Sequence, residues 1–521
     1  MIVRNFVEKE KYYDSVFLMR MAKDIAAMDG IGNISVGMGT PLNKDTIEEL
    51  GLMLDAGRQA TPNDLIIALS AEDDTTAEAA RDTFLKLLMS KNTAGASQDF
   101  RSLDTLVRTV KDRNLAVISL AGQYAGEEAE KALKAGMNVF MFSDNVPLKQ
   151  EIQLKNLAKE KGLLMMGPDC GLSFINGVAI GLCSKVRRGP IGIAAASGSG
   201  MQEVMNIIHK NGMGISHAIG VGGRDLREEV GGITMLQSIE ILENDPETKV
   251  IVLISKPPAK ATAEKIFAAL ANCSKPVVVQ FINSDAVFPD HKDWYCSDSF
   301  ENTATIAMAL AKGEPVKTIS EKEYYEKFEE EAARIAAGFT GGQRYLRGIY
   351  CGGSLAEEVL TLAQEKLGPL YGNIAFSEEY ILDNPFESYK DCLIDIGAEE
   401  FTVGKPHVAI DPVPRLARFE KEARDPETAV ILLDFLLGYS LCEDPAGMMA
   451  ETIADGIRHA QEENRQLCVV ASVCGSDLDP QELKKQEKIL QDAGVIVLEN
   501  NGAAARFAIA VIQKRRELLK Q

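Results

Sequence analysis

Two stretches of this chain, about 155 residues apart, have the same pattern of glycine and serine in front of an apolar helix. One is residues 197–200 and the other is residues 352–354, and each follows a strand-like apolar run. Apolar residues then recur at i, i+4 and i+7, the spacing of one helix face. Backbone N–H groups at a glycine-rich helix start bind anions, and the helix dipole favours negative charge there. The pattern predicts two phosphate sites, made by Ser197, Gly198, Ser199, Gly200, Gly352, Gly353 and Ser354.

Both helix starts also have the spacing of a capping box, in which a serine hydroxyl and a side chain three residues later satisfy backbone N–H groups at the helix start. Ser199 is followed by Gln202, and Ser354 is followed by Glu357. We therefore expect each helix to begin at its serine.

Short apolar strands alternate with amphipathic helices along almost the whole chain, which predicts an α/β fold with mostly parallel sheets. In the first region we expect strands at 1–7, 33–38 and 64–70 and helices at 14–28, 43–53 and 75–90, with a loop at 91–101. At 521 residues the chain has room for several domains. The predicted domains are an N-terminal α/β domain (1–100), a second domain (101–188), a third (189–315), a linker helix (316–341) and a fourth (342–521).

The third and fourth domains look like copies of one another. Each begins with a Gly-Ser helix, and each has an Asp-Pro-Glu-Thr motif, at 245–248 and 425–428, before a later strand. The second copy has about 25 extra residues near 372–390. We interpret this as an internal duplication, which would bring the carboxyl ends of two sheets together around one site.

Composition narrows the classes of partner. The net charge of −20 argues against nucleic acid or an anionic membrane surface, because both require a positive surface. No apolar run reaches the length of a membrane span, and the first residues lack the apolar core of a signal peptide. The nine cysteines are scattered without metal-ligand spacing, so we expect reduced thiols, no metal and a cytoplasmic location.

Several segments resemble the succinyl-CoA synthetase superfamily. Residues 166–171 (MGPDCG) resemble the segment that joins its CoA-binding and ligase domains. Residues 191–200 and 351–354 resemble the phosphate helices of its α and β subunits, and 220–223 (GVGG) resembles a strand-end loop. The resemblance implies a Rossmann-like CoA-binding-type domain at 101–188, two flavodoxin-like ligase domains, and an extra N-terminal α/β domain.

One branch is similar along the whole chain, the FdrA family, which is a fused α/β form. The similar segments are 36–41, 60–64, 141–146, 222–226, 255–259 and 403–407. This family resemblance implies either an acyl-CoA synthetase or an oxamate carbamoyltransferase of purine (allantoin) catabolism that works with companion subunits.

Three departures from a CoA ligase argue for the transferase. The phosphorylated histidine of the family would lie near His291, whose neighbours differ. Lys256 occupies the strand end where the family has a glutamate. About 30 residues separate the two copies, too few for an ATP-grasp domain, and no GxxxxGK[ST] loop exists. The chain thus keeps a phosphate site and loses the parts that make the high-energy phosphate. We expect no required cofactor, and CoA binding stays open because 37–39 (GMG) lack the rest of a glycine-rich loop.

The resulting hypothesis is an acyl-phosphate transferase. The phosphate of carbamoyl phosphate would lie between the two helix starts, with Lys256 or Arg224 neutralising the leaving phosphate. Oxamate, a small carboxylate acceptor, would attack the carbamoyl carbon and form oxalurate. Its carboxylate would be bound by Arg224, Lys405 or His407.

Other assignments at this site remain open. Asp169 and Asn145, at predicted strand ends, are substrate-binding or structural. Arg224 could instead pair with Asp225 or Glu229, and Lys256 could be a surface lysine in an ion pair. Two alternatives to the transferase also remain: a subunit of an NDP-forming acyl-CoA synthetase, and a non-catalytic scaffold for companion subunits.

Overall fold

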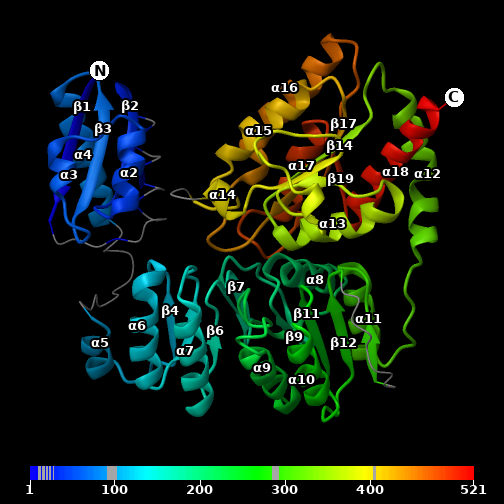
Figure 1. Ribbon diagram of the computed structural model, residues 1–521, viewed down its shortest axis with the longest axis horizontal. Helices are drawn as coiled ribbons and strands as arrows, with labels where there is room; N and C mark the ends of the chain where they lie inside the picture. Colours follow the sequence, from blue (N-terminus) through cyan, green and yellow to red (C-terminus); the bar gives the residue numbers. More distant parts are fainter. Residues whose placement is uncertain are drawn as a thin grey trace. The chain divides into compact units, whose positions relative to one another are not determined.

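The computed structural model describes residues 1–9, 13, 18, 21–22, 25–26, 28–90, 102–283, 293–402 and 406–520. Two compact units are present, one containing Met1–Lys111 and the other Asp112–Phe401 with His407–Gln521. Figure 1 shows the elements of both. The predicted loop at 91–101 and the candidate residues His291 and Lys405 lie outside the described residues.

The N-terminal unit contains a sheet of three strands, β1 (Ile2–Glu8), β2 (Ile31–Met38) and β3 (Leu65–Ala71). β3 lies between the other two and is antiparallel to both, so the parallel pairing expected for α/β segments does not hold here. Its helices are α2 (Pro41–Glu49), α3 (Asp55–Gln59), α4 (Asp74–Ser90) and α5 (Leu103–Thr109). The predicted helix 43–53 ends early, at Glu49, because Gly51 adopts a left-handed φ of 69° and ends α2. The described residues of the predicted helix 14–28 are mostly helical.

The second unit begins with a small parallel sheet, of order β4-β5-β6. Its elements are β4 (Leu115–Ile118), α6 (Gly122–Lys134), β5 (Asn138–Met141), α7 (Leu148–Glu160) and β6 (Met165–Met166). Buried ion pairs connect helix α7 of this small domain to the loop after β10. Lys155 Nζ lies 2.6 Å from Asp225 Oδ1 and 3.3 Å from Glu151 Oε1, and all three side chains are fully buried.

The first ligase-like copy follows a hairpin of β7 (Leu172–Ile175) and β8 (Val178–Gly181). Its strands are β9 (Arg188–Ala195), β10 (Ile215–Gly220), β11 (Val250–Ser255), β12 (Val277–Phe281) and β13 (Trp294–Cys296). Its helices are α8 (Gly198–Lys210), α9 (Ile233–Asn244), α10 (Lys260–Leu270) and α11 (Phe300–Lys312). The predicted charged linker helix is present as α12 (Glu321–Ala337).

The second copy has strands β14 (Tyr345–Tyr350), β15 (Tyr371–Gly372), β16 (Cys392–Asp395), β17 (Thr428–Leu436), β18 (Cys468–Cys474) and β19 (Ile496–Leu498). Its helices are α13 (Gly353–Lys366), α14 (Glu399–Thr402), α15 (Val413–Arg424), α16 (Pro445–Glu462), α17 (Leu483–Asp492) and α18 (Asn501–Leu519), with a short 3₁₀ helix at Glu378–Tyr380.

The two copies have the same strand order, as the interpretation of an internal duplication requires. The order is β10-β9-β11-β12-β13 in the first copy and β16-β14-β17-β18-β19 in the second, with parallel pairing throughout. Numbered within each copy, leaving aside the two-residue β15, both are 2-1-3-4-5, the flavodoxin-like order. The predicted α/β fold with two flavodoxin-like domains is therefore confirmed, and the extra residues 367–391 of the second copy hold β15 and the 3₁₀ helix.

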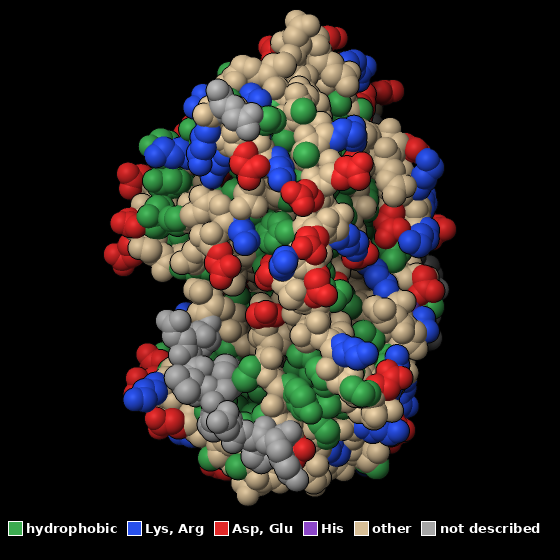
Figure 2. Space-filling view, turned by 90° about the vertical axis from the view of Figure 1, so that its right-hand side faces the viewer, with side chains coloured by type: hydrophobic (Ala, Val, Ile, Leu, Met, Phe, Trp, Pro, Cys, Tyr) green, Lys and Arg blue, Asp and Glu red, His purple; other side chains and the backbone are tan. Residues whose placement is uncertain are grey.

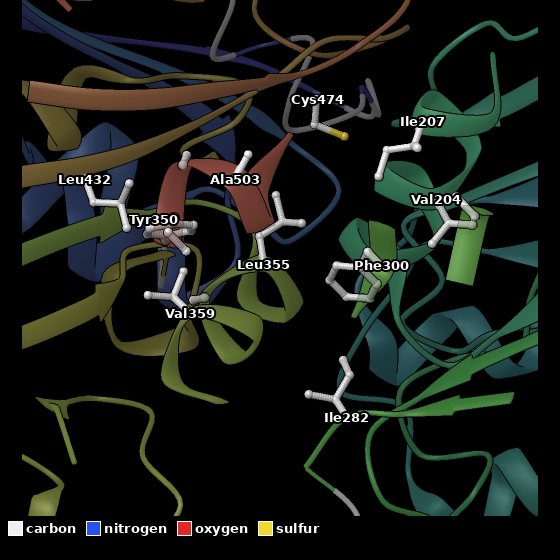
Figure 3. Packing of buried hydrophobic residues seen from close by; sticks show 14 of the residues in the cluster. Val204, Ile207, Ile282, Phe300, Tyr350, Leu355, Val359, Leu432, Cys474 and Ala503 are labelled. Carbon is white, nitrogen blue, oxygen red and sulfur yellow. The ribbon is translucent and has the colours of Figure 1, made fainter. Parts of the chain in front are cut away.

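One hydrophobic core joins the copies. It contains the inward faces of α8 and α11 from the first copy and of α13 and α18 from the second. Figure 3 shows Val204 and Phe300 of the first copy opposite Leu355 and Val359 of the second. The outer helices cover the other face of each sheet and form separate cores. Since burial of this kind is the main stabilising term in folding, the copies form one permanent body.

Surface charge agrees with the composition. On the face drawn in Figure 2, acidic and basic side chains are intermixed and no continuous basic area is visible. Among the described residues, no helix combines the length and the apolar character that crossing a membrane requires.

Candidate functional site at the joint of two helix starts

The first helices of the two copies meet at their N-terminal ends, as the sequence predicted. α8 and α13 each follow the first strand of a copy, so both starts lie at the carboxyl ends of the sheets. Ser197 Oγ donates to Ser354 Oγ at 2.8 Å, and Ser354 N donates to Ser199 Oγ at 3.2 Å. The seven predicted phosphate-binding residues therefore belong to one joint.

The predicted capping boxes are wrong. The helices begin at Gly198 and Gly353, one residue before the serines, and neither N-cap residue makes a side-chain cap bond. The serine hydroxyls instead bond across the joint. Gln202 donates to Leu437 O at 3.0 Å, and Glu357 pairs with Lys256.

The start of α13 is already occupied by a carboxylate of the protein. Asp434, within β17, accepts hydrogen bonds from Cys351 N at 2.9 Å and Gly352 N at 2.8 Å. Arg415 Nη2 lies 2.9 Å from the same carboxylate, and both side chains are almost completely buried. An internal anion thus lies directly before the first turn of α13 and uses the N–H group of Gly352, one of the predicted phosphate-binding residues.

The start of α8 has no such partner. Among the described residues, no acceptor bonds to the backbone N–H groups of Gly198, Ser199 and Gly200. Approach from outside is open at Gly198, since a Cβ built there would have only Leu172 near it, at 4.0 Å. In the first turn of α13, Ser354 N bonds to Ser199 Oγ, and no acceptor bonds to Gly353 N or Leu355 N among the described residues. The first turn of α8 therefore has one more open N–H group than that of α13.

Lys256 lies where the sequence placed it, directly after β11. Its Nζ is 2.5 Å from Oε1 of Glu357 in the first turn of α13, and its side chain is 58% exposed. The expected ion pair is present, and it spans the joint between the copies. The positive charge of Lys256 lowers the pKa of Asp169 and of Asp395, and so offsets part of the increase that burial causes in each.

Arg224 is held by α7. Its Nη2 donates to Val146 O at 2.7 Å and lies 2.8 Å from Oε2 of the buried Glu151. Asp225 pairs with Lys155 instead, so the alternative pairing of Arg224 with Asp225 or Glu229 is wrong. This geometry gives Arg224 a positioning role between the small sheet and the first copy.

Asp169 and Asn145 lie in turns after β6 and β5, with left-handed φ values of 56° and 52°. Asp169 is an exposed residue of its turn. Partial burial, followed by the negative charge of Asp144, raises the pKa of Asp169 to about 6. Asn145 is exposed.

A second acidic group, Asp395, was missed by the sequence analysis. It ends β16 next to the start of α13, and a Cβ on Gly353 would lie 2.8 Å from its Oδ2. Burial raises the pKa of Asp395 to about 7. The hydrogen bond from Gly397 N lowers this pKa, and the negative charge of Asp434 raises it. Asp395 and Asp434 share a signal that could have revealed them, an acidic residue inside or ending a run of apolar strand residues.

His407 is next to Asp395. A Cβ on Gly397 would lie 2.6 Å from His407 Nε2 and 3.0 Å from Asp395 Oδ1. His407 Nδ1 accepts from Ala409 N at 3.2 Å, which leaves the ring proton on Nε2. Burial lowers the pKa of His407, so the ring is neutral near neutral pH. The pair could hold or transfer one proton beside the joint.

Two cysteines flank these loops, and both are buried as predicted. Burial raises the pKa of Cys170 to about 12 and that of Cys351 well above the ordinary value. A thiol that stays protonated is a poor nucleophile, so packing is their role.

Comparisons with known proteins match three parts of the chain to family models. Family models match at residues 187–282 (CoA binding domain), 349–511 (CoA-ligase) and 1–102 (AllF, heavy metal-associated domain). Residues 1–102 contain neither Cys nor His. They therefore do not fit a soft metal ion, which thiolate and imidazole ligands bind.

One relative spans almost the whole chain, and others match parts of it. The Escherichia coli (strain K12) uncharacterized protein YahF is 40% identical over 97% of this chain and 98% of its own length. The α subunit 2 of the ADP-forming succinate–CoA ligase of Archaeoglobus fulgidus is 27% identical over 32% of this chain and 58% of its own length. The apo structure of the dinucleotide forming acetyl-coenzyme A synthetase 1 of Ca. Korarchaeum cryptofilum has 15% identity, a TM-score of 0.34, and coverage of 84% of this chain and 93% of its own. The chain thus belongs to the YahF family, within the succinyl-CoA synthetase-like superfamily of proteins with CoA-binding and CoA-ligase domains.

Proposed function

We propose that this chain is the acyl-transferring subunit of an acyl-CoA synthetase-type enzyme, and that it binds the phosphoryl group of an acyl phosphate at the start of α8. The observation that carries the proposal is the set of unpartnered N–H groups at Gly198, Ser199 and Gly200, facing the start of the opposite helix. The CoA-ligase and CoA-binding matches support CoA as the acyl acceptor or donor.

The proposed step is an acyl transfer. The sulfur of the CoA thiol attacks the acyl carbon, the bond from that carbon to the phosphate oxygen breaks, and phosphate leaves. The N–H groups of α8 and the ammonium of Lys256 would stabilise the charge that develops on the leaving phosphate. Asp395, with a pKa of about 7, would take the thiol proton.

The acyl phosphate must be made elsewhere. Between the two copies, the described chain forms only α12 and its short connections, with no domain that could hold a nucleotide. A companion subunit would therefore supply the nucleotide-dependent step. This is the alternative of the sequence analysis, which the comparisons favour over its first choice.

A second candidate is carbamoyl transfer from carbamoyl phosphate to oxamate, forming oxalurate and phosphate. The specific observation in its favour is Lys256, a half-exposed cation in the ligase glutamate's position, which suits neutralisation of the leaving phosphate. This reaction uses the same phosphate site and requires neither nucleotide nor CoA. Its substrates rest on the FdrA resemblance.

Phosphate release distinguishes the two candidates. The chain, alone and with companion subunits, would be given acetyl phosphate or carbamoyl phosphate, each with CoA, with oxamate or with neither. CoA-dependent release supports the synthetase-type reaction, and oxamate-dependent release from carbamoyl phosphate supports carbamoyl transfer. If no acceptor stimulates release in any combination, both candidates fail and the scaffold alternative remains.

A further inference from the structure

A pocket of about 300 Å³ lies at the amino ends of strands in the second copy. Tyr345 begins β14, Tyr371 begins β15 and Asp391 directly precedes β16, and all three line the pocket. The joint of α8 and α13 lies at the carboxyl ends of the same sheet. At roughly 3.3 Å per residue, the six residues of β14 separate the two places by about 17 Å.

The extra segment of the second copy shapes the aromatic wall of this pocket. Tyr371 packs edge to face against Tyr380, with ring centroids 5.3 Å apart, and against Tyr389 at 4.8 Å. Tyr345, Leu367 and Pro369 complete the apolar lining. Rings fixed by mutual packing offer flat faces on which another ring can stack.

Three charged side chains line the pocket, and one of them, Lys390, is a cation outside the ion pair that the other two form. Arg516, on α18 (red in Figure 1), pairs with Asp391 and donates to Leu367 O at 3.2 Å. Asp391 also accepts from Leu346 N at 2.9 Å, so this pair is satisfied. Lys390 has no carboxylate partner among the described residues. Its Nζ lies 4.9 Å from the ring centroid of Tyr389 and 5.9 Å from that of Tyr371.

The backbone of Lys390 adopts a conformation that is unusual for its residue type. Its φ of 50° is in the left-handed region, which lysine seldom adopts. Residues held in such conformations cluster at binding sites, where the surrounding structure fixes them.

We propose that this pocket binds a small anion that carries a planar aromatic ring, of about the size of a mononucleotide. On binding, the ammonium of Lys390 would move from the tyrosine rings to the negative group, and the ligand ring would stack on a tyrosine face. A cationic ligand does not fit, because Lys390 would repel it. The volume is at the lower end for small-molecule sites, too small for a dinucleotide. The proposal is independent of the reaction at α8.

Calorimetric titration of the full chain tests the proposal. AMP and benzoate serve as ringed anions, adenosine as a ring without the charge, and ribose 5-phosphate as a charge without the ring. The variants are Lys390→Gln and Lys390→Arg. Lys366→Gln is the matched control, because Lys366 lies over Tyr325 at 5.2 Å but does not line the pocket.

We expect saturable binding of AMP or benzoate, and AMP binding at least tenfold tighter than adenosine or ribose 5-phosphate. Lys390→Gln should weaken binding of the ringed anion about tenfold, whereas Lys390→Arg and Lys366→Gln should retain it. Which ringed anion binds more tightly identifies the subclass, nucleotide or aromatic carboxylate. The proposal is overturned if neither binds at millimolar concentration, or if Lys390→Gln binds as the unchanged chain does.

Discussion

At the scale of single residues, the two helix starts differ in one acceptor. Asp434 bonds to the N–H groups before α13, whereas no side chain does the same for α8. The glycines differ in the same way. Gly353 has no room for a side chain beside Asp395, and Gly198 does. The proposed anion site at α8 therefore depends on the lack of a side-chain acceptor there among the described residues, and not on the glycines that both helix starts contain.

Asp395 makes folding stability depend on pH. A carboxyl group whose pKa is about 7 in the folded chain and near 4 in the unfolded chain binds more protons when folded, between these two values. Wild-type stability should therefore fall, relative to Asp395→Asn, as the pH rises from 4 to 7. The difference should reach at most about 4 kcal/mol, since each pKa unit corresponds to about 1.4 kcal/mol.

Urea unfolding at several pH values measures this difference. Asp383→Asn, at an exposed position of the same copy, controls for the change in net charge. A constant stability difference between wild type and Asp395→Asn over this pH range would contradict the account.

At the scale of elements, the copies exchange helix caps. Glu203 of α8 accepts from Asn501 N, the first residue of α18, at 2.8 Å. Glu358 of α13 accepts from Phe300 N, the first residue of α11, at 2.9 Å. Each glutamate thus satisfies a buried N–H group at the last helix of the other copy, and the exchange ties the two copies together beyond their shared core.

Removal of either cap should destabilise the second unit as a whole. We expect Glu203→Ala and Glu358→Ala each to lower the free energy of unfolding by about 1–3 kcal/mol, because each leaves a buried donor without an acceptor. Glu365→Ala, at an exposed position of α13, should change it by less than about 0.5 kcal/mol. Chemical unfolding measures all three, and losses at positions 203 and 358 no larger than at 365 would refute the role of the caps.

The same elements show what the sequence could predict. Apolar runs located the three strands of the N-terminal unit within two residues, and the matched Gly-Ser starts indicated the repeated domains and the joint of α8 and α13. Pairing across the chain is not encoded in such local patterns. The antiparallel β1 and β3, the bonds of Ser199 and Ser354 across the joint, and the bond of Asp434 to Gly352 all depend on partners far away in sequence.

At the scale of the whole molecule, the question is whether the chain requires a metal. The described residues contain no cluster of three or more metal-ligating side chains, and the N-terminal unit has the fold match of a heavy metal-associated domain without its usual ligand types.

Metal removal should therefore leave the protein unchanged. After dialysis against EDTA, we expect the melting temperature to shift by less than about 1 °C, because no folding free energy is coupled to metal binding. Elemental analysis before dialysis should find much less than one transition metal ion per chain. A stoichiometric metal, lost together with several degrees of melting temperature, would contradict this.

The open start of α8 is the central claim, and one pair of variants tests it directly. Gly198→Asp would put a carboxylate at the free N–H groups, in a space that can hold the side chain, and Gly198→Asn is its neutral match of nearly equal size. Calorimetric titration with inorganic phosphate should find binding in the wild type, binding within about threefold of it in Gly198→Asn, and a loss of at least tenfold in Gly198→Asp. Equal phosphate binding by both variants would show that the anion does not bind at this helix.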